Sequence, residues 1–103
     1  MKANLDDIQD WLLLAQRANW SAVNLAKQCG VCKRTLERYF LKQMGKSPKV
    51  WLAEQRQFQA LKVIQEGYSI KESSQLIGYE HPSQFSREFR KFWGYCPASP
   101  IPV

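Results

Sequence analysis

The pattern of apolar and polar positions predicts helices along most of the chain and strand-like alternation nowhere. The longest predicted helix lies between Ser47 and Gly67. Ser47 is a favourable N-cap, Pro48 suits the first helical position, and Gly67 can turn left-handed after the last turn. These signals predict a helix of about 19 residues, about 28 Å long. Because its polar stripe is narrow, we expect other elements to cover it from more than one side.

Capping residues predict shorter helices before this segment. Asn4, followed by Asp6 and Asp7, favours the start of a first helix, because acidic side chains stabilise a helix N-terminus. Ser21 is the predicted N-cap of a second helix, and Gly30 is predicted to end it. The N-terminal part of the chain is therefore helical in this interpretation.

The same pattern stands on both sides of the long helix. On one side, a glycine turn precedes a helix with Leu36 and Phe40 facing inward; on the other, a glycine turn precedes Phe85 and Phe89 in matching positions. A short helix, a glycine-containing turn and a second helix with a polar outer face form the helix-turn-helix pattern. An internal repeat is stronger evidence about architecture than any single motif.

We therefore predict an all-α chain in three parts. Residues 1–47 form a first helix-turn-helix subdomain, residues 48–67 the connecting helix, and residues 68–103 a second helix-turn-helix subdomain with a proline-rich tail. A chain of 103 residues has the size of one domain, or of two very small subdomains that share a connector.

The net charge of +6 is unevenly distributed and predicts a polyanionic partner. Residues 32–50 contain Glu37 as their single acidic residue among many lysines and arginines, whereas the connecting helix is close to neutral. The basic residues predicted to contact phosphate are Lys33, Lys42, Lys46, Lys49, Arg90 and Lys91.

The outward faces of the two turn-following helices have the chemistry that reads base edges. The first face contains Lys33, Arg34, Glu37 and Arg38; the second contains His81, Ser83, Ser86 and Arg87. Arginine can bind guanine O6 and N7, glutamate can accept from cytosine N4, and serine can bond several base edges. We therefore predict sequence-specific binding of double-stranded DNA by a monomer.

Several segments together resemble the DNA-binding domain of the AraC/XylS family, over about Asp7 to Pro97. The resemblance rests on the following segments: Gly30-Val31-Cys32-Lys33-Arg34-Thr35-Leu36-Glu37-Arg38-Tyr39-Phe40, Gly45-Lys46-Ser47-Pro48, Arg56, Gly78-Tyr79 and Phe85-Ser86-Arg87-Glu88-Phe89-Arg90-Lys91. It implies about seven helices in two helix-turn-helix subdomains joined by a long helix, a role in bacterial transcription, and RNA polymerase as a candidate second partner.

The resemblance also implies roles for individual residues. The base-reading residues that it implies are Arg34, Glu37 and Arg38 in the first unit and Pro82, Ser83, Ser86 and Arg87 in the second. Arg56 matches a family arginine in the linker helix, where its apolar neighbours favour anchoring of the fold over contact with DNA.

This chain departs from the family pattern in three respects. Cys32 and Cys96 replace the usual serine at turns, which removes a good helix cap. Ser73-Ser74 replace the usual apolar residue and alanine, so we expect looser packing there, with the Ser73 hydroxyl bonded to the carbonyl one turn back. Most family members also have a sensor domain, for which this chain has no room. It is therefore either a fragment of a longer regulator or a stand-alone member.

A second interpretation rests on Cys29-Gly-Val-Cys32, which has the spacing of redox pairs and of half a zinc site. It makes the chain a thiol redox- or metal-responsive DNA-binding regulator. Against it, further zinc ligands lie far away in sequence, and a βαβ context is missing. We expect no enzyme activity, no cofactor, no metal and no membrane partner. Without a visible secretory signal, an odd number of cysteines favours the cytoplasm, with association to the nucleoid.

Overall fold

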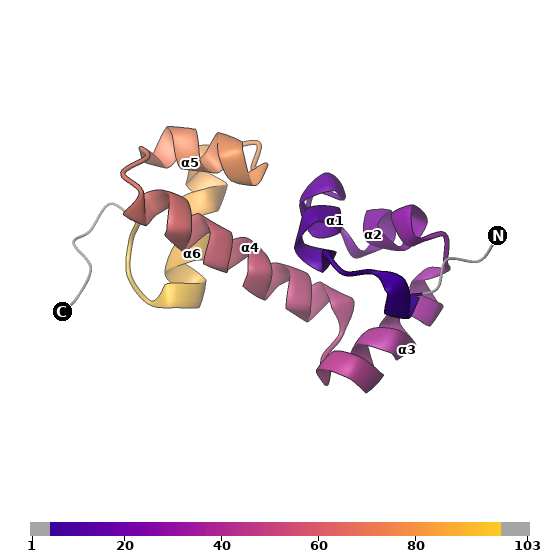
Figure 1. Ribbon diagram of the computed structural model, residues 1–103. Coiled ribbons are helices and arrows are strands. Elements are labelled where there is room, and N and C mark those ends of the chain that lie inside the picture. The colour runs from indigo at the N-terminus through magenta and orange to yellow at the C-terminus, as the bar shows by residue number, and fades with distance from the viewer. Residues whose placement is uncertain (1–4, 98–103) are drawn as a thin grey trace. The chain divides into compact units, whose positions relative to one another are not determined.

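The computed structural model describes residues 5–97, and it contains α-helices and one 3₁₀ helix but no strand in that range (Figure 1). The elements are η1 (Leu5–Asp7), α1 (Trp11–Arg17), α2 (Ala22–Cys29), α3 (Lys33–Met44), α4 (Pro48–Gln65), α5 (Ile70–Ile77) and α6 (Pro82–Trp93). The all-α prediction is confirmed, and the six α-helices with η1 agree with the expected number of about seven. Asn4 and the tail after Pro97 lie outside the described residues.

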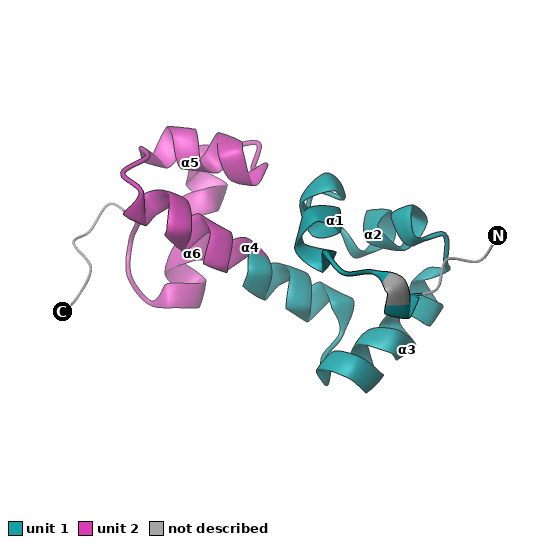
Figure 2. Cartoon of the chain, in the orientation of Figure 1, with its two compact units in different colours: residues 1–55 teal, residues 56–103 magenta. Residues whose placement is uncertain are grey.

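The chain forms two compact units, residues 1–55 and residues 56–103, hereafter the first and the second unit (Figure 2). The division falls inside α4, between Gln55 and Arg56. Each unit therefore contains one helix-turn-helix pair and one part of the long helix: α2 and α3 in the first unit, α5 and α6 in the second.

The start of the first helix differs from the prediction. The chain forms the short η1 first, and α1 begins only at Trp11. The physical reason is the N-cap at Asp10, whose Oδ1 accepts the backbone N–H of Leu13 at 2.9 Å. The prediction for Ser21 is confirmed, because its side chain caps α2. At α5, Ser69 and Glu72 form a capping box.

The core of the first unit is made by the inward faces of its helices. Leu25 of α2, Leu36 and Phe40 of α3 and Leu52 of α4 are each almost completely buried. The edge of the Phe40 ring meets Trp11 with ring centroids 5.0 Å apart. The burial of such apolar side chains is the main stabilising contribution to a small helical unit.

The second unit repeats the scheme with a more aromatic core. Phe85 and Phe89 of α6 are completely buried, together with Ala60 of α4, and Ile77 and Tyr79 are nearly so. The Phe85 and Phe89 ring centroids are 6.0 Å apart and the rings are stacked. Two apolar side chains one turn apart thus hold α6 on its core.

The expectation for the Ser73 hydroxyl is wrong. The Ser73 side chain is completely buried in α5, and its Oγ has no hydrogen-bond partner. The backbone carbonyl one turn back, that of Ser69, accepts the backbone N–H of Ser73 at 2.8 Å instead. An unpartnered buried hydroxyl is costly, so α5 includes a local source of instability.

The predicted capping residues of α4 are confirmed, but other elements cover the helix only in part. Ser47 Oγ accepts the N–H of Val50 at 3.3 Å, and Gly67 adopts a left-handed φ of +94°. The side chains of Val50 and Phe58 remain 49% and 45% exposed. Within the described residues, no helix is long and apolar enough to cross a membrane.

Candidate nucleic-acid interface

The first helix-turn-helix pair is formed by α2 and α3. The backbone of Gly30 is left-handed, with φ +70°, a conformation that side-chain-bearing residues rarely adopt. The N–H of Val31 returns to the carbonyl of Ala26 at 3.1 Å, which closes the C-terminus of α2. The chain then enters α3 at Cys32, whose side chain makes no capping hydrogen bond.

The burial of one face of α3 determines which residues remain on the other. Because Leu36 and Phe40 are completely buried, α3 cannot rotate without exposing them. Arg34 and Arg38 are then exposed, and Glu37 is half-buried. The three predicted base-reading residues of this unit therefore all belong to one helix, with the two arginines exposed and Glu37 at the border of the buried face.

The second pair, α5 and α6, has the same construction. Gly78 is left-handed, with φ +87°, and Pro82 occupies the first turn of α6, where its missing N–H is not required. The predicted reading residues of α6 differ in exposure: Pro82, Ser83 and Arg87 are exposed, and Ser86 is half-buried. His81, the N-cap residue, is exposed and makes no side-chain cap.

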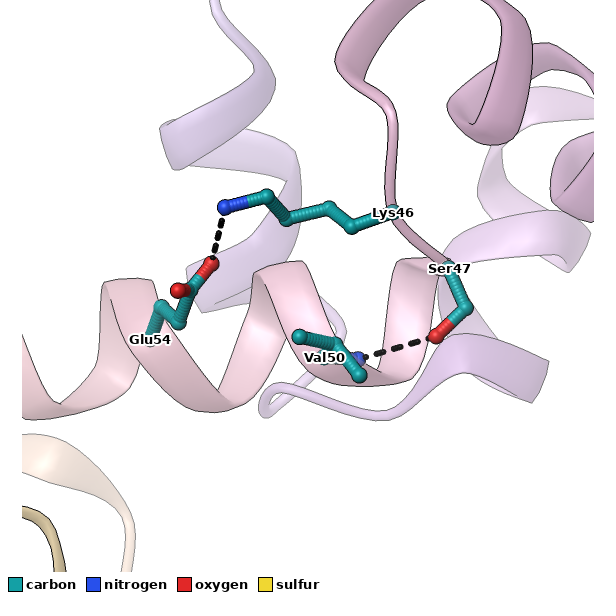
Figure 3. A network of polar contacts seen from close by, with 4 residues as sticks. All are labelled: Lys46, Ser47, Val50 and Glu54. Carbon is teal, nitrogen blue, oxygen red and sulfur yellow. Dashed lines mark hydrogen bonds and ion pairs between the residues drawn. The ribbon is translucent and has the colours of Figure 1, made fainter.

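The predicted phosphate-contacting cations are found in two different environments. The exposed ones are Lys33, Lys42, Lys49, Arg90 and Lys91. Lys46 is only half-exposed, because its Nζ lies 2.7 Å from Oε1 of Glu54 (Figure 3). Figure 3 shows the Lys46 side chain extending from the segment before α4 to this carboxylate on α4. A phosphate contact by Lys46 therefore requires this ion pair to open or to be shared.

The two cysteines of the Cys29-Gly-Val-Cys32 segment lie in different surroundings. Cys29 is in the core of the first unit, and burial raises the pKa of its thiol. Cys32 is exposed, and a hydrogen bond with Thr35, at 3.1 Å between Sγ and Oγ1, lowers the pKa of its thiol. Among the described residues, no cluster of three or more histidine, cysteine or acidic side chains could hold a metal ion. Nothing here supports the thiol- or metal-responsive interpretation.

Arg56 has the anchoring position that was expected from the sequence. Its guanidinium carbon lies 3.6 Å from the centroid of the Tyr79 ring, and its Nη2 donates to the carbonyl of Gly78 at 3.2 Å. Both contacts are to the α5–α6 turn, so the side chain connects α4 to that turn.

Sequence patterns did not identify the other polar side chains around Tyr79. Gln57 Nε2 donates to the Tyr79 hydroxyl at 3.1 Å, and both side chains are buried. Burial raises the pKa of the Tyr79 hydroxyl, and the negative charge of Glu88 on α6 acts in the same direction. Gln57 stands among Gln55, Arg56 and Gln59, so nothing in the sequence marked it as a buried residue with a hydrogen-bond partner.

The two helix-turn-helix pairs, α2 with α3 and α5 with α6, define the class of the chain: it is a double helix-turn-helix protein. Residues 25–99 match the family model described as a helix-turn-helix domain. The chain belongs to this family and, like its structural neighbours, to the AraC type of DNA-binding domain. The resemblance found in the sequence is thereby confirmed.

Individual relatives agree with this assignment. The HTH-type transcriptional regulator RipA of Corynebacterium glutamicum is 37% identical over 70 residues, which are 68% of this chain and 21% of RipA. The chain thus spans about a fifth of the length of that relative. A transcriptional regulator of Chromobacterium violaceum with an AraC-type DNA-binding domain has a TM-score of 0.68 at 26% identity, covering 84% of this chain and 80% of that one.

A third relative was solved with its ligand. The DNA-binding domain of AdpA, described as a global transcriptional factor, is in complex with a target DNA. It matches this chain with a TM-score of 0.71 and 27% identity, covering 84% of this chain and 82% of that one.

Proposed function

We propose that this chain is the sequence-specific double-stranded DNA-binding domain of a bacterial transcription regulator, with α3 and α6 as its recognition helices. The observation that carries the proposal is the construction of these two helices. Each follows a left-handed glycine turn, buries two apolar side chains and leaves polar side chains exposed. That is the arrangement by which a helix-turn-helix pair presents its second helix to a major groove.

The polar side chains outside the two cores have different proposed roles. Arg34, Glu37 and Arg38 of α3 read the first half-site, and Pro82, Ser83, Ser86 and Arg87 of α6 read the second. Because these two sets have different chemistry, the half-sites are expected to differ in sequence. Phosphate contacts by Lys33, Lys42, Lys46, Lys49, Arg90 and Lys91 add affinity and fix register without selecting a sequence.

The length of α4 supports insertion into adjacent major grooves. Its 18 residues correspond to about 27 Å. Major grooves on one side of B-DNA recur about every 34 Å. A monomer with one recognition helix near each end of such a connector has the reach to occupy two successive grooves. Contact with RNA polymerase stays a prediction of the resemblance.

Selection of bound duplexes from a random DNA pool tests the function directly. We expect enrichment of a sequence with two unlike half-sites about one helical turn apart, and binding that weakens steeply with salt. Each phosphate neutralised contributes about −0.9 to the slope of log K against log salt. A pool without enrichment, together with a slope near zero, would exclude DNA binding as the function.

A further inference from the structure

Gln57 of α4 is a polar residue that is almost completely buried within the second unit. Its Nε2 donates to the hydroxyl of Tyr79 at 3.1 Å, and Tyr79 is itself only 5% exposed. Tyr79 belongs to the turn between α5 and α6, so this bond joins α4 to the turn that leads into the second proposed recognition helix. Neither side chain is among the proposed DNA contacts, so the buried pair has some other role.

The adjacent residue of α4 makes further contacts with the same turn. Arg56 Nη2 donates to the carbonyl of Gly78 at 3.2 Å, and the Arg56 guanidinium carbon lies 3.6 Å from the centroid of the Tyr79 ring. The Tyr79 ring in turn meets the ring of Phe85 on α6 edge to face, with ring centroids 5.6 Å apart. Tyr79 therefore connects α4 to α6, through contacts that all lie within the second unit.

The buried amide of Gln57 contributes little to stability. Placing a polar group in a core is costly unless hydrogen bonds replace those that it made to water. Gln57 Oε1 is buried without a hydrogen-bond partner, so this cost is only partly offset. A methionine of similar volume would fill the same space without the cost. The effect of Gln57 is therefore geometric, because a buried hydrogen bond permits fewer arrangements than apolar contact does.

The position of Phe85 in α6 makes this geometry relevant to base recognition. Ser86 and Arg87, two of the proposed reading residues, follow Phe85 directly in the chain. Apolar packing of Phe85 is non-directional and tolerates small rotations of α6. Such a rotation moves Phe85 against the Tyr79 ring, and the bond to Gln57 opposes the movement because a hydrogen bond weakens steeply with angle and distance. Binding groups need to be held within about 0.5 Å of their productive geometry.

We propose that Gln57, through its hydrogen bond to the Tyr79 hydroxyl, is a positioning residue that fixes the α5–α6 turn and the start of α6, and thereby sets base discrimination at the second half-site. Neither Gln57 nor Tyr79 touches DNA in this role. The inference rests on the proposed function, because it assumes that α6 reads bases. It adds a specificity-determining pair outside the proposed reading residues.

Two substitutions remove this bond from opposite ends. Gln57→Met and Tyr79→Phe both leave the charge of the chain unchanged and the side-chain volume almost unchanged. For each protein, Kd is measured for the duplex that the wild-type chain selects and for the same duplex with its second half-site scrambled. The ratio of these two dissociation constants measures discrimination at that half-site. The corresponding ratio for the first half-site is an internal control, because α3 lies in the other unit.

We expect both substitutions to reduce the second-half-site ratio at least about fivefold, the lower end of what one good base contact contributes to discrimination. The first-half-site ratio should stay at its wild-type value. Gln57→Met should keep or raise the melting temperature, because it removes an incompletely bonded amide from the core. The double variant Gln57→Met/Tyr79→Phe should lose no more discrimination than either single variant, because all three lack the same bond.

Gln65→Met is the matched control, since it makes the same substitution at an exposed position of α4. Ile64→Val controls for stability, because it thins the packing against the same core; it should lower the melting temperature and leave both ratios unchanged. An unchanged second-half-site ratio for Gln57→Met or Tyr79→Phe, or an equal loss for Ile64→Val, would overturn the positioning role while DNA binding stands. A wild-type chain that selects no duplex would instead remove the proposed function, and the positioning role with it.

Discussion

Lys46 Nζ lies 2.7 Å from Oε1 of Glu54, so a predicted phosphate-contacting cation is already paired with a carboxylate of its own unit. The two side chains are 38% and 29% exposed. A partly exposed pair of this kind contributes about 0–1 kcal/mol to stability. Phosphate therefore competes with Glu54 for the ammonium group at little cost to the fold.

Glu54→Gln should release Lys46 for DNA. We expect the slope of log K against log salt to become steeper by about 0.9, the contribution of one further phosphate contact. Glu66→Gln is the matched control, since it removes one charge from an exposed residue beyond the end of α4. Salt titrations that give the same slope for both variants would show that the ion pair with Glu54 does not limit the phosphate contact of Lys46.

Arg38→Ala and Lys42→Ala should impair binding in different ways. Arg38 lies two residues beyond the buried Leu36 and is exposed. As a proposed base contact, its loss should cost about 1–3 kcal/mol and relax specificity at one position. Lys42 lies one turn later and is exposed, so its loss should weaken all sequences alike. Titrations against matched and scrambled duplexes distinguish these outcomes, and equal losses on both duplexes for both variants would contradict the assignment.

Five base pairs inserted between the half-sites should reduce the affinity strongly. Half a helical turn moves the second half-site to the opposite face of the DNA, out of reach of a connector about 27 Å long. The affinity should fall to that of a duplex containing the first half-site alone, and footprinting should show protection of that half-site only. An insertion of ten base pairs controls for length, because it restores the face. Unchanged affinity after the five-base-pair insertion would show that α4 does not set the spacing.

Ser73→Ala should stabilise the second unit. The substitution removes a completely buried hydroxyl that has no hydrogen-bond partner and leaves almost the same volume. We expect the free energy of unfolding to rise by about 1 kcal/mol, measured from the midpoint of a denaturant titration. Ser83→Ala, at an exposed position of the same unit, should change it by less than about 0.5 kcal/mol. Destabilisation by Ser73→Ala would mean that the hydroxyl has a partner in solution.

Cys32 should react with iodoacetamide before Cys29 does. The lowered pKa of the Cys32 thiol gives it a larger thiolate fraction at any pH below that pKa, whereas burial both raises the pKa of Cys29 and blocks access. Thr35→Val removes the hydroxyl that lowers the pKa, so alkylation of Cys32 near neutral pH should slow. Mass spectrometry of timed samples follows both sites, and an unchanged rate would show that Thr35 does not control this thiol.

The features that sequence predicted well depend on neighbouring residues. Ser21, Ser47 and Gly30 act within one helical turn, through a capping hydrogen bond or a left-handed backbone, so residue type and spacing were sufficient. The predicted start of the first helix was wrong, although it also depended on a local cap. Asn4 and Asp10 are both good caps, and the preference between them depends on packing. Local signals therefore gave the architecture but not every boundary.

The features that sequence missed depend on contacts between distant residues. Gln57 and Tyr79 are 22 positions apart, and nothing in either local segment indicates the other. The Lys46–Glu54 pair spans eight positions and includes the segment before α4, so helical spacing does not predict it. The exposure of Arg34, Arg38 and Arg87 could be predicted, because the buried positions of α3 and α6 determine which side chains remain outside. That these side chains read bases stays a prediction.

The division of α4 between two cores has a consequence for backbone protection. Isolated helices shorter than about 12–15 residues are marginal in water, so neither part of α4 keeps its hydrogen bonds without its own core. When the second unit opens, the amides beyond Arg56 lose their support, while those near Leu52 remain held by the first unit. Amide hydrogen exchange along this single helix is then governed by two opening reactions, and the change from one to the other falls near Gln55.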